Sequence, residues 1–175
     1  MSMELRLAGP DDAERLSAFA RDAFDAAFGS LYRQQDLASF YAGSRSAETY
    51  RRNLSDPAVR TALLEEDGAI RAYALLILGR GFPERPQPHP ARPALLSQLY
   101  CAGGTTGQGL GASLLDWATA EARDWGADAL QLSVYSENHG AQRFYRRHGF
   151  AHIADIHYWV GTHRDDEYLY ELPLG

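Results

Sequence analysis

The stretch LYCAGGTTGQGLGA, residues 99–112, decides the fold of this chain. It begins with apolar and aromatic residues typical of a strand end, and five glycines then fall within the nine positions 103–111. After the glycines, apolar residues recur every three or four positions, as in an amphipathic helix, at Leu110, Leu114, Leu115, Ala118, Ala122 and Trp125. Glycine lets several backbone N–H groups point into one concavity, and the first turn of a helix adds unpaired donors and the positive end of its dipole. The stretch therefore predicts a phosphate or pyrophosphate site, with a flexible surface loop as the alternative.

The composition predicts a single globular domain over residues 1–175. Hydrophobic residues make up 45% of the chain, enough for a sizeable core, and the charged share of 23% is ordinary. The single cysteine, Cys101, allows no intrachain disulfide, which favours a reducing compartment. No secretory signal is visible, and the longest apolar run, Ala72 to Leu78, is far short of the about 20 residues that span a bilayer. We expect a cytoplasmic protein without a membrane partner.

The charged residues exclude several chemistries. All 17 basic residues are arginine and lysine does not occur, which excludes Schiff-base lysine chemistry and the lysine of a nucleotide-triphosphate P-loop. The formal net charge is −6, and no basic cluster is interleaved with aromatic residues, so nucleic acid is not an expected partner. An acidic surface gives weak support to a cationic substrate.

Hydrophobic periodicity and turn residues predict one α/β domain with a mixed sheet. Strands are expected at residues 3–8, 61–66, 69–78, 94–102, 130–135, 150–153, 156–160 and 168–172. Helices are expected over 10–28, 110–126 and 141–148. A further helical region between the first of these and Pro57 is expected in two pieces, with Ser46 as the N-cap of the second piece. Asp67-Gly68 predicts a hairpin, and five prolines at positions 79–93 predict a long surface loop.

Two motifs together resemble those of the GCN5-related N-acetyltransferase (GNAT) superfamily. The first, from Thr106 to Ala112, carries the paired glycines Gly109 and Gly111 of that superfamily's loop after a strand. The second matches the pattern Asn-x-x-Ala-x-x-Phe-Tyr-x-x-x-Gly-Phe at Asn138, Ala141, Phe144, Tyr145, Gly149 and Phe150. The segment between the motifs leaves room for one helix and one strand, as in the superfamily.

The resemblance implies a single GNAT-like domain with a mixed, mostly antiparallel central sheet flanked by helices and an acyl-CoA cleft between splayed strands. It implies acetyl-CoA as the acetyl donor, with pantetheine along the end of one strand and pyrophosphate over the glycine loop. The residues implied to bind it are Leu99, Tyr100, Cys101, Thr106, Gly107, Gln108, Gly109, Leu110, Gly111, Ala112, Asn138 and Phe144. Asn138 is equally suited to cap the helix that follows it. Thr106 departs from the superfamily's usual Arg or Gln, so backbone N–H groups and Gln108 are expected to hold the pyrophosphate.

Tyr145 is the catalytic residue that the resemblance implies. When an amine attacks the thioester, coenzyme A leaves as a thiolate that needs a proton. A phenol with a pKa near 10 is a suitable donor to a thiolate whose conjugate acid has a pKa of about 8.5. The alternative is a core tyrosine beside Phe144 on an amphipathic helix.

The sequence names no general base. The superfamily often uses a glutamate on the strand before the glycine loop, but residues 93–102 contain no carboxylate, and Ser97 and Gln98 are not bases. A water relay, His157 or Asp155 could serve instead. A covalent route through Cys101 is disfavoured because a cysteine at the end of an apolar strand is usually a core residue.

A metal site is also disfavoured. Histidines and carboxylates gather near the end of the chain, at His152, His157, His163, Asp165 and Asp166. Their spacing on strands would place them on different faces, so ordinary hairpin residues are expected and no metal.

The predicted function is acetyl transfer from acetyl-CoA to a primary amine of a small molecule that is polyamine-like or amino-acid-like. Scattered positions near both ends resemble the bacterial branch that acetylates polyamines and other small amines, and a homodimer is compatible with this. Phe28, Tyr32 and the loop 81–93 are candidate walls of the amine pocket. A non-catalytic acyl-CoA-binding or sensing module is the first alternative. A dinucleotide-binding redox domain is the second, but the loop lacks the spacing G-x-G-x-x-G.

Overall fold

The structure, a computed structural model, describes every residue except 1 and 106. Its centre is one seven-stranded sheet in the order β1-β2-β3-β4-β5-β7-β6. Within the described residues, β4 and β5 are parallel and all other neighbouring strands are antiparallel, so the sheet is mixed and mostly antiparallel, as predicted. The strands are β1 (Met3–Leu7), β2 (Val59–Glu66), β3 (Ala69–Leu78), β4 (Pro93–Cys101), β5 (Ala129–Tyr135), β6 (Ala151–Val160) and β7 (His163–Pro173).

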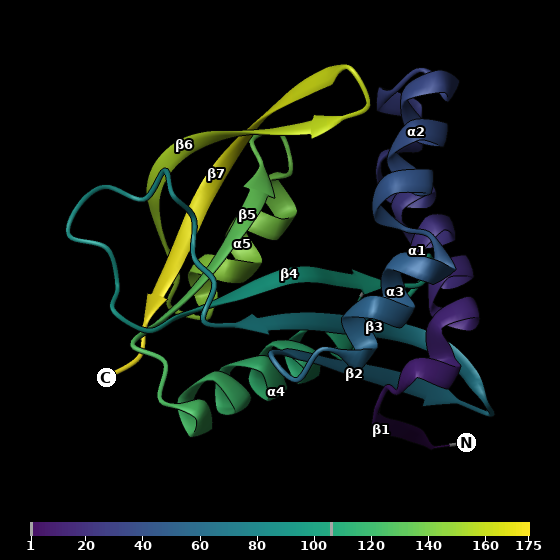
Figure 1. Cartoon of the computed structure of the whole chain (residues 1–175), viewed down its shortest axis with the longest axis horizontal. Helices are drawn as coiled ribbons and strands as arrows, with labels where there is room; N and C mark the ends of the chain where they lie inside the picture. Colours follow the sequence, from purple (N-terminus) through teal and green to yellow (C-terminus); the bar gives the residue numbers. More distant parts are fainter. Residues whose placement is uncertain (1, 106) are drawn as a thin grey trace.

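Strands β4 and β5 pair at one end and then diverge. Their register joins Pro93 to Ala129 and Leu95 to Gln131, where the pairing ends. On the other side of β4, the register with β3 shifts so that Ser97 is the extra residue of a β-bulge. Bulges bend a strand and increase its twist. Figure 1 shows β5, β7 and β6 rising away from the half of the sheet that β1 to β4 form. Beyond Leu95, the β4 backbone therefore has no strand partner on its β5 side.

Helices cover both faces of the sheet. Helix α4 (Leu110–Trp125) packs on β3 and β4 from one side, and α1 (Ala13–Phe28) and α3 (Ala47–Ser55) lie on the other (Figure 1). Helix α2 (Gln34–Ser44) lies beside β6, and α5 (His139–Arg147) follows β5. Two short 3-10 turns, η1 (Pro10–Asp12) and η2 (Gly29–Leu31), flank α1.

The two faces of the sheet carry separate cores because strand side chains alternate between faces. Leu64 and Leu76 of the sheet face α4 and pack with Leu114 and Leu115 of that helix. Leu63, Tyr73 and Leu75 face α1 and α3 instead, where they pack with Leu16, Ala20 and Tyr50. A third cluster joins Phe24, Leu37 and Phe40 to Val160 at the end of β6.

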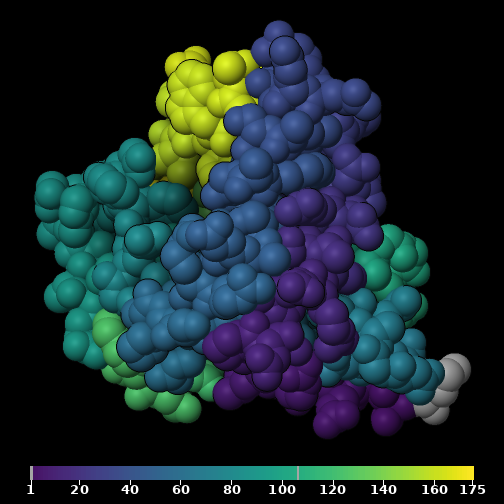
Figure 2. All heavy atoms as spheres, turned by 45° about the vertical axis from the view of Figure 1, so that its right-hand side comes forward, coloured from purple at the N-terminus to yellow at the C-terminus, as the bar shows by residue number. Residues whose placement is uncertain are grey.

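The tip of the β6–β7 hairpin is attached to α2. The Asp36 carboxylate accepts hydrogen bonds from the backbone N–H and the hydroxyl of Thr162, both at 2.8 Å. The backbone hydrogen bond from Thr162, with help from Arg33, lowers the pKa of Asp36 to about 2. Figure 2 shows the yellow hairpin tip lying against the blue helix α2. This attachment closes one end of the space between the two halves of the sheet.

Most elements match the predictions, and the final strands need correction. The expected N-cap is confirmed, because the Ser46 hydroxyl accepts from the backbone N–H of Thr49 at 3.1 Å. The separate strands expected at 150–153 and 156–160 are wrong: β6 is continuous over Ala151–Val160, and a register shift between His152 and Ala154 absorbs the break in the pattern. Strand β7 begins at His163 rather than 168. The prediction missed its first residues because the inward side chains there are acidic and point into a cavity, so the apolar alternation of a core strand is missing.

Candidate active site

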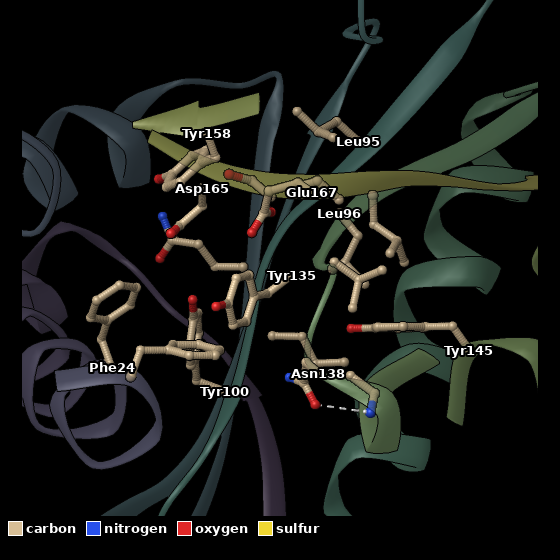
Figure 3. A pocket seen from close by; sticks show the side chains of 18 of the residues that line it. Phe24, Leu95, Leu96, Tyr100, Tyr135, Asn138, Tyr145, Tyr158, Asp165 and Glu167 are labelled. Atoms are coloured by element: carbon tan, nitrogen blue, oxygen red, sulfur yellow. Dashed lines mark hydrogen bonds between the residues drawn. The ribbon is translucent and has the colours of Figure 1, made fainter. Parts of the chain in front are cut away.

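A cavity of about 250 Å³ opens where β4 and β5 diverge. We call it the central cavity. Residues 95–100 of β4 and 132–135 of β5 line it, together with side chains from α1, α5 and β7. Figure 3 shows Tyr145 entering from one side while Asp165 and Glu167 point in from β7. The divergence of two strands therefore brings together side chains from distant parts of the sequence.

One wall of the central cavity is aromatic. Phe24 and Phe28 pack against each other at the end of α1 with tilted rings whose centroids are 5.2 Å apart, and the ring centroid of Tyr100 of β4 lies 6.2 Å from that of Phe24. Phe28 and Tyr32 line the cavity, as expected for walls of an amine pocket. The proline-rich loop contributes Phe82 alone among the described residues, so the prediction that the loop 81–93 forms a wall is only partly met.

The rest of that loop is fastened to the sheet. Arg85 pairs with Glu171 of β7, with Nη2 at 2.8 Å from Oε1, and Gln131 donates to the same carboxylate at 2.7 Å. The backbone N–H of Phe82 donates to Gln131 Oε1 at 2.8 Å. These contacts hold Phe82 at the cavity and leave the following prolines at the surface.

Tyr145 lies on α5 with its hydroxyl group directed toward the central cavity (Figure 3). Its ring packs against Phe144 and Phe150, with centroids 5.1 and 5.6 Å away. Burial raises the pKa of the phenol well above its ordinary value, and nearby Tyr100 and Cys101 add to this. The group therefore keeps its proton at neutral pH. Tyr145 is both part of the core and open to the cavity, so the two readings from sequence coexist.

Two carboxyl groups of β7 face the same space. Asp165 is 4% exposed and accepts a hydrogen bond from the hydroxyl of Tyr32. Glu167 is 9% exposed, and burial raises its pKa to about 7, a rise that a hydrogen bond from Ser133 only partly opposes. A carboxyl group with a pKa near neutrality can gain and lose a proton under ordinary conditions.

Sequence reasoning missed both carboxyl groups. Each lies in a charged run, residues 163–167, that looks like a solvated hairpin. Alternation along β7 sends Asp165 and Glu167 inward and Asp166 outward, a signal that could have been read from the spacing alone. The bases considered from sequence are not cavity residues: Asp155 pairs with His152 at 2.8 Å and His157 with Asp166 at 3.3 Å, both near the surface.

Gln98 and Arg45 also line the central cavity and were not assigned a role from sequence. Gln98 is buried on β4, and its Oε1 accepts from the hydroxyl groups of Tyr50 and Tyr73, each at 2.7 Å. This pair of donors fixes the amide so that its Nε2 remains free to donate. Arg45 follows α2 and is 5% exposed, with its guanidinium 4.7 Å from the centroid of Phe40.

A second cavity, of about 450 Å³, lies at the glycine loop. We call it the loop cavity. It brings together most of the residues expected to bind the donor, and these are Cys101, Gly107, Gly109, Leu110, Gly111, Ala112 and Phe144. Leu99, Tyr100 and Asn138 line the central cavity instead. Gln108 lines neither cavity and its backbone N–H donates to Thr105 at 3.2 Å. Thr106 lies outside the described residues.

The loop cavity fits a pyrophosphate. Gly107 and Gly109 have φ values of 84° and 74°, which glycine adopts without strain, and a side chain at either would project into open space. Helix α4 begins directly after Gly109, so its first N–H groups and the positive end of its dipole face the loop. Arg147 of α5 adds a guanidinium to the cavity lining, a contact that the sequence did not predict.

Asn138 performs the capping role. Its Oδ1 accepts from the backbone N–H of Ala141 at 3.1 Å, drawn as the dashed line in Figure 3. Its Nδ2 is then available to the central cavity, which Asn138 also lines. The structure is thus compatible with both roles considered for this residue.

The remaining alternatives find little support in the geometry. Cys101 is half-buried, burial raises the pKa of its thiol, and no histidine lines the loop cavity beside it. No group of three or more His, Cys, Asp or Glu side chains within the described residues could hold a metal ion. In the same part of the chain, no helix has both the length and the apolar character of a membrane span.

Comparison with known proteins agrees with this geometry. The model of the acetyltransferase (GNAT) family matches residues 21–150. An uncharacterised N-acetyltransferase of Mycobacterium tuberculosis is 32% identical over 158 residues, 90% of this chain and 95% of the relative. An uncharacterised N-acetyltransferase of Lactobacillus delbrueckii subsp. lactis is 23% identical over 163 residues, which are 93% of this chain and 92% of the relative.

Solved structures show the same fold. The PaiA N-acetyltransferase of Thermoplasma acidophilum, in complex with coenzyme A, has a TM-score of 0.79 at 20% identity over 99% of this chain and 100% of that one. The ribosomal-protein-S18-alanine N-acetyltransferase of Escherichia coli has a TM-score of 0.70 at 19% identity, over 99% of this chain and 95% of that one.

The chain belongs to the acetyltransferase (GNAT) family. Its class is therefore that of an acyl-CoA-dependent N-acetyltransferase, and its acetyl donor is acetyl-CoA.

Proposed function

We propose that this protein transfers the acetyl group of acetyl-CoA directly to a primary amine of a small molecule. The observation that carries the proposal is the central cavity, where a phenol that keeps its proton and a carboxyl group with a pKa near 7 face the same space. The size of the cavity, about 250 Å³, favours a small acceptor.

The two cavities support a specific position for the donor. The β4 backbone at Leu99 and Tyr100 is paired with β3 but, in the described part of the chain, has no strand partner on its β5 side. On that side it can form hydrogen bonds with an extended pantetheine arm, as it would with a further strand. The loop at Gly107 and Gly109, with Arg147, is suited to the pyrophosphate. Phe144 lies between these regions and lines the loop cavity. The thioester then reaches the central cavity beside Tyr145.

The proposed reaction needs one base and one acid. Acetyl-CoA supplies an acetyl thioester. Glu167, in its carboxylate form, takes a proton from the ammonium group of the acceptor, and the amine nitrogen then forms a bond to the acetyl carbon. As the carbon–sulfur bond breaks, Tyr145 donates its proton to the leaving sulfur, the phenolate takes up the second proton that the acylated nitrogen loses, and Glu167 releases its proton to solvent. The Asp165 carboxyl group lines the same cavity and faces the incoming cation.

Three finer expectations remain part of the proposal. Membership of the small-amine branch rests on scattered positions near both ends of the chain. A cytoplasmic location rests on the single unpaired cysteine. A homodimer has physical support in Trp159, 59% exposed on the outermost strand β6.

Release of free coenzyme A from acetyl-CoA, detected as thiol, tests the proposal. The acceptors are polyamines, amino acids, aminoglycosides and a histone-tail peptide. Turnover on small amines, with none on the peptide, is the expected result. Binding of acetyl-CoA by calorimetry without turnover on any acceptor would replace the proposal with the sensing module. Turnover on the peptide alone would contradict the small-molecule class.

A further inference from the structure

Arg45 is a buried cation without a carboxylate partner. Its residue is 5% exposed, its Nη1 donates to the backbone carbonyl of Ser44 at 3.0 Å, and its buried Nε has no hydrogen-bond partner. Among the described residues it forms no ion pair, although fourteen such pairs occur elsewhere. Buried charges in proteins are normally paired, because an unpaired one forfeits the hydration it had in the unfolded chain.

The guanidinium is held at the central cavity by aromatic rings. It lies 4.7 Å from the centroid of Phe40 and 6.0 Å from that of Phe24, and its side chain lines the cavity. Tyr100 lies beside it: burial raises the pKa of that phenol to about 12, and the positive charge of Arg45 partly opposes the rise. The rings position the charge but cannot neutralise it.

The groups around Arg45 in the cavity add further donors. Gln98 has its Oε1 fixed by Tyr50 and Tyr73, which leaves Nε2 to donate. The hydroxyl of Tyr100 is a further donor at the same wall. A guanidinium, an amide N–H and a phenol O–H together match the two oxygens of a carboxylate, which a guanidinium binds with two parallel hydrogen bonds.

Two acidic side chains face the cavity from β7. Asp165 and Glu167 are both buried and line the cavity (Figure 3), and among the described residues neither forms an ion pair with Arg45. A ligand with one positive and one negative group would satisfy both sets at once. A polyamine would bring a second positive charge toward the unpaired guanidinium, which is unfavourable in a low-dielectric site.

We propose that the acceptor is an amine that also carries a carboxylate, such as a free amino acid, with its carboxylate on Arg45 and its amine toward Glu167. This inference rests on the proposed acetyl transfer and names its substrate class. Arg45 is then a specificity-determining residue rather than a catalytic one.

Matched acceptors test the inference in the wild-type protein. Each set contains an amino acid, its neutral amide and its decarboxylated amine: for example L-phenylalanine, L-phenylalaninamide and phenethylamine, with parallel sets built on leucine and glutamate. Spermidine is added as the polyamine. In at least one set we expect kcat/KM for the carboxylate to exceed that for the other two by about tenfold or more. Amides and amines that equal or exceed every carboxylate would overturn the inference and leave acetyl transfer standing.

Arg45→Gln separates recognition from folding. Its kcat/KM should fall about tenfold on the preferred carboxylate and change by less than about threefold on the matching amine. Arg45→Lys keeps the positive charge without the planar guanidinium, so its kcat/KM on the carboxylate should lie between those of the wild type and Arg45→Gln. Thermal unfolding and acetyl-CoA affinity report whether each variant folds. Equal losses on all three acceptors would make Arg45 a structural residue and contradict the assignment.

Calorimetry on the coenzyme A complex reads the same preference without turnover. The amino acids should bind and their amides should bind about tenfold more weakly. Absence of turnover on every acceptor, with this preference present, would contradict acetyl transfer but support the recognition site. Equal binding of amino acids and amides would overturn the recognition site by itself.

Discussion

At the scale of single residues, the proposed mechanism depends on two groups with opposite proton-transfer roles. Tyr145 comes from α5 and Glu167 from β7, and burial raises the pKa of both. The same physical cause keeps the phenol protonated and moves the carboxyl group into the range where it can act as a base. Tyr145 could be assigned from its motif. Alternation along β7 could have placed Glu167 on an inward face, but its meeting with Arg45 could not be predicted, because only the folded sheet brings residues 45 and 167 to one cavity.

Replacing Tyr145 by Phe should lower kcat by about tenfold or more, because the leaving thiolate loses its proton donor. The affinity for acetyl-CoA should stay nearly unchanged, since the ring still packs against Phe144 and Phe150. Steady-state kinetics and calorimetry measure the two quantities. Tyr168→Phe is the control, because Tyr168 stacks on His152 outside the cavity. An unchanged kcat in the Tyr145 variant would remove Tyr145 from the mechanism.

Glu167 should determine the acidic limb of the pH profile. Its carboxylate is the active form of the base, so kcat/KM of the wild type should rise with pH through about 7. Glu167→Gln should lower kcat/KM and remove that limb, leaving only the ionisation of the acceptor amine. A wild-type limb that persists near pH 7 in the variant would show that another group is the base.

At the scale of elements, the proposed donor site is the junction of β4, the glycine loop and α4. The sequence located this junction because glycine spacing and helical periodicity are local signals. It also gave the helix boundaries closely, with α4 ending at Trp125 before Gly126. The bulge at Ser97 and the early end of the β4–β5 pairing were not predictable, since they depend on the register with distant strands.

Gly109→Ala should weaken acetyl-CoA binding and destabilise the protein. Gly109 has φ of 74°, where a Cβ is strained by about 1 kcal/mol or more, and a methyl group there would project into the loop cavity. Gly43→Ala is the matched control, since Gly43 is exposed in α2 and alanine there should raise stability by up to about 1 kcal/mol. Calorimetry and chemical denaturation test both. Unaltered donor binding in Gly109→Ala would argue against the loop as the pyrophosphate site.

At the scale of the whole molecule, the sheet opens into two halves that pair at one end, and the hairpin of one half is attached to helix α2 at the other. Pairing of Pro93–Leu95 with Ala129–Gln131 joins them at one end, and the Asp36–Thr162 contact fastens the hairpin to α2 at the other. The fold class followed from the alternation of predicted strands and helices and from the motifs. The charge distribution of the cavity did not, because a net charge of −6 says nothing of where each charge lies.

Global stability should record the burial of Glu167. Its folded pKa of about 7 is above the unfolded value of 4.5, so its favourable contribution is complete below pH 4.5 and is lost as pH rises through 7. Glu167→Gln should therefore match the wild type near pH 5 and exceed it by roughly 3 kcal/mol near pH 8. Chemical denaturation at the two pH values measures this.

Glu171 provides a comparison of opposite sign. Hydrogen bonding from Arg85 lowers the pKa of its carboxyl group, so its contribution is present above pH 4.5 and is lost as pH falls through the lowered value. Glu171→Gln should therefore be less stable than the wild type at pH 8. If Glu167→Gln is less stable than the wild type at pH 8, burial does not raise the pKa of Glu167 in the folded protein.

The central claim, direct transfer of acetyl from acetyl-CoA to an amine, is tested most directly by following a carbonyl-labelled acetyl group by ¹³C NMR. Acetyl-CoA, the protein and an amino-acid acceptor are mixed, and the thioester resonance is monitored. We expect the thioester resonance to be replaced by an amide resonance on the acceptor, with one free thiol released per amide formed and no mass added to Cys101. A persistent thioester resonance, or acetate as the only product, would contradict it.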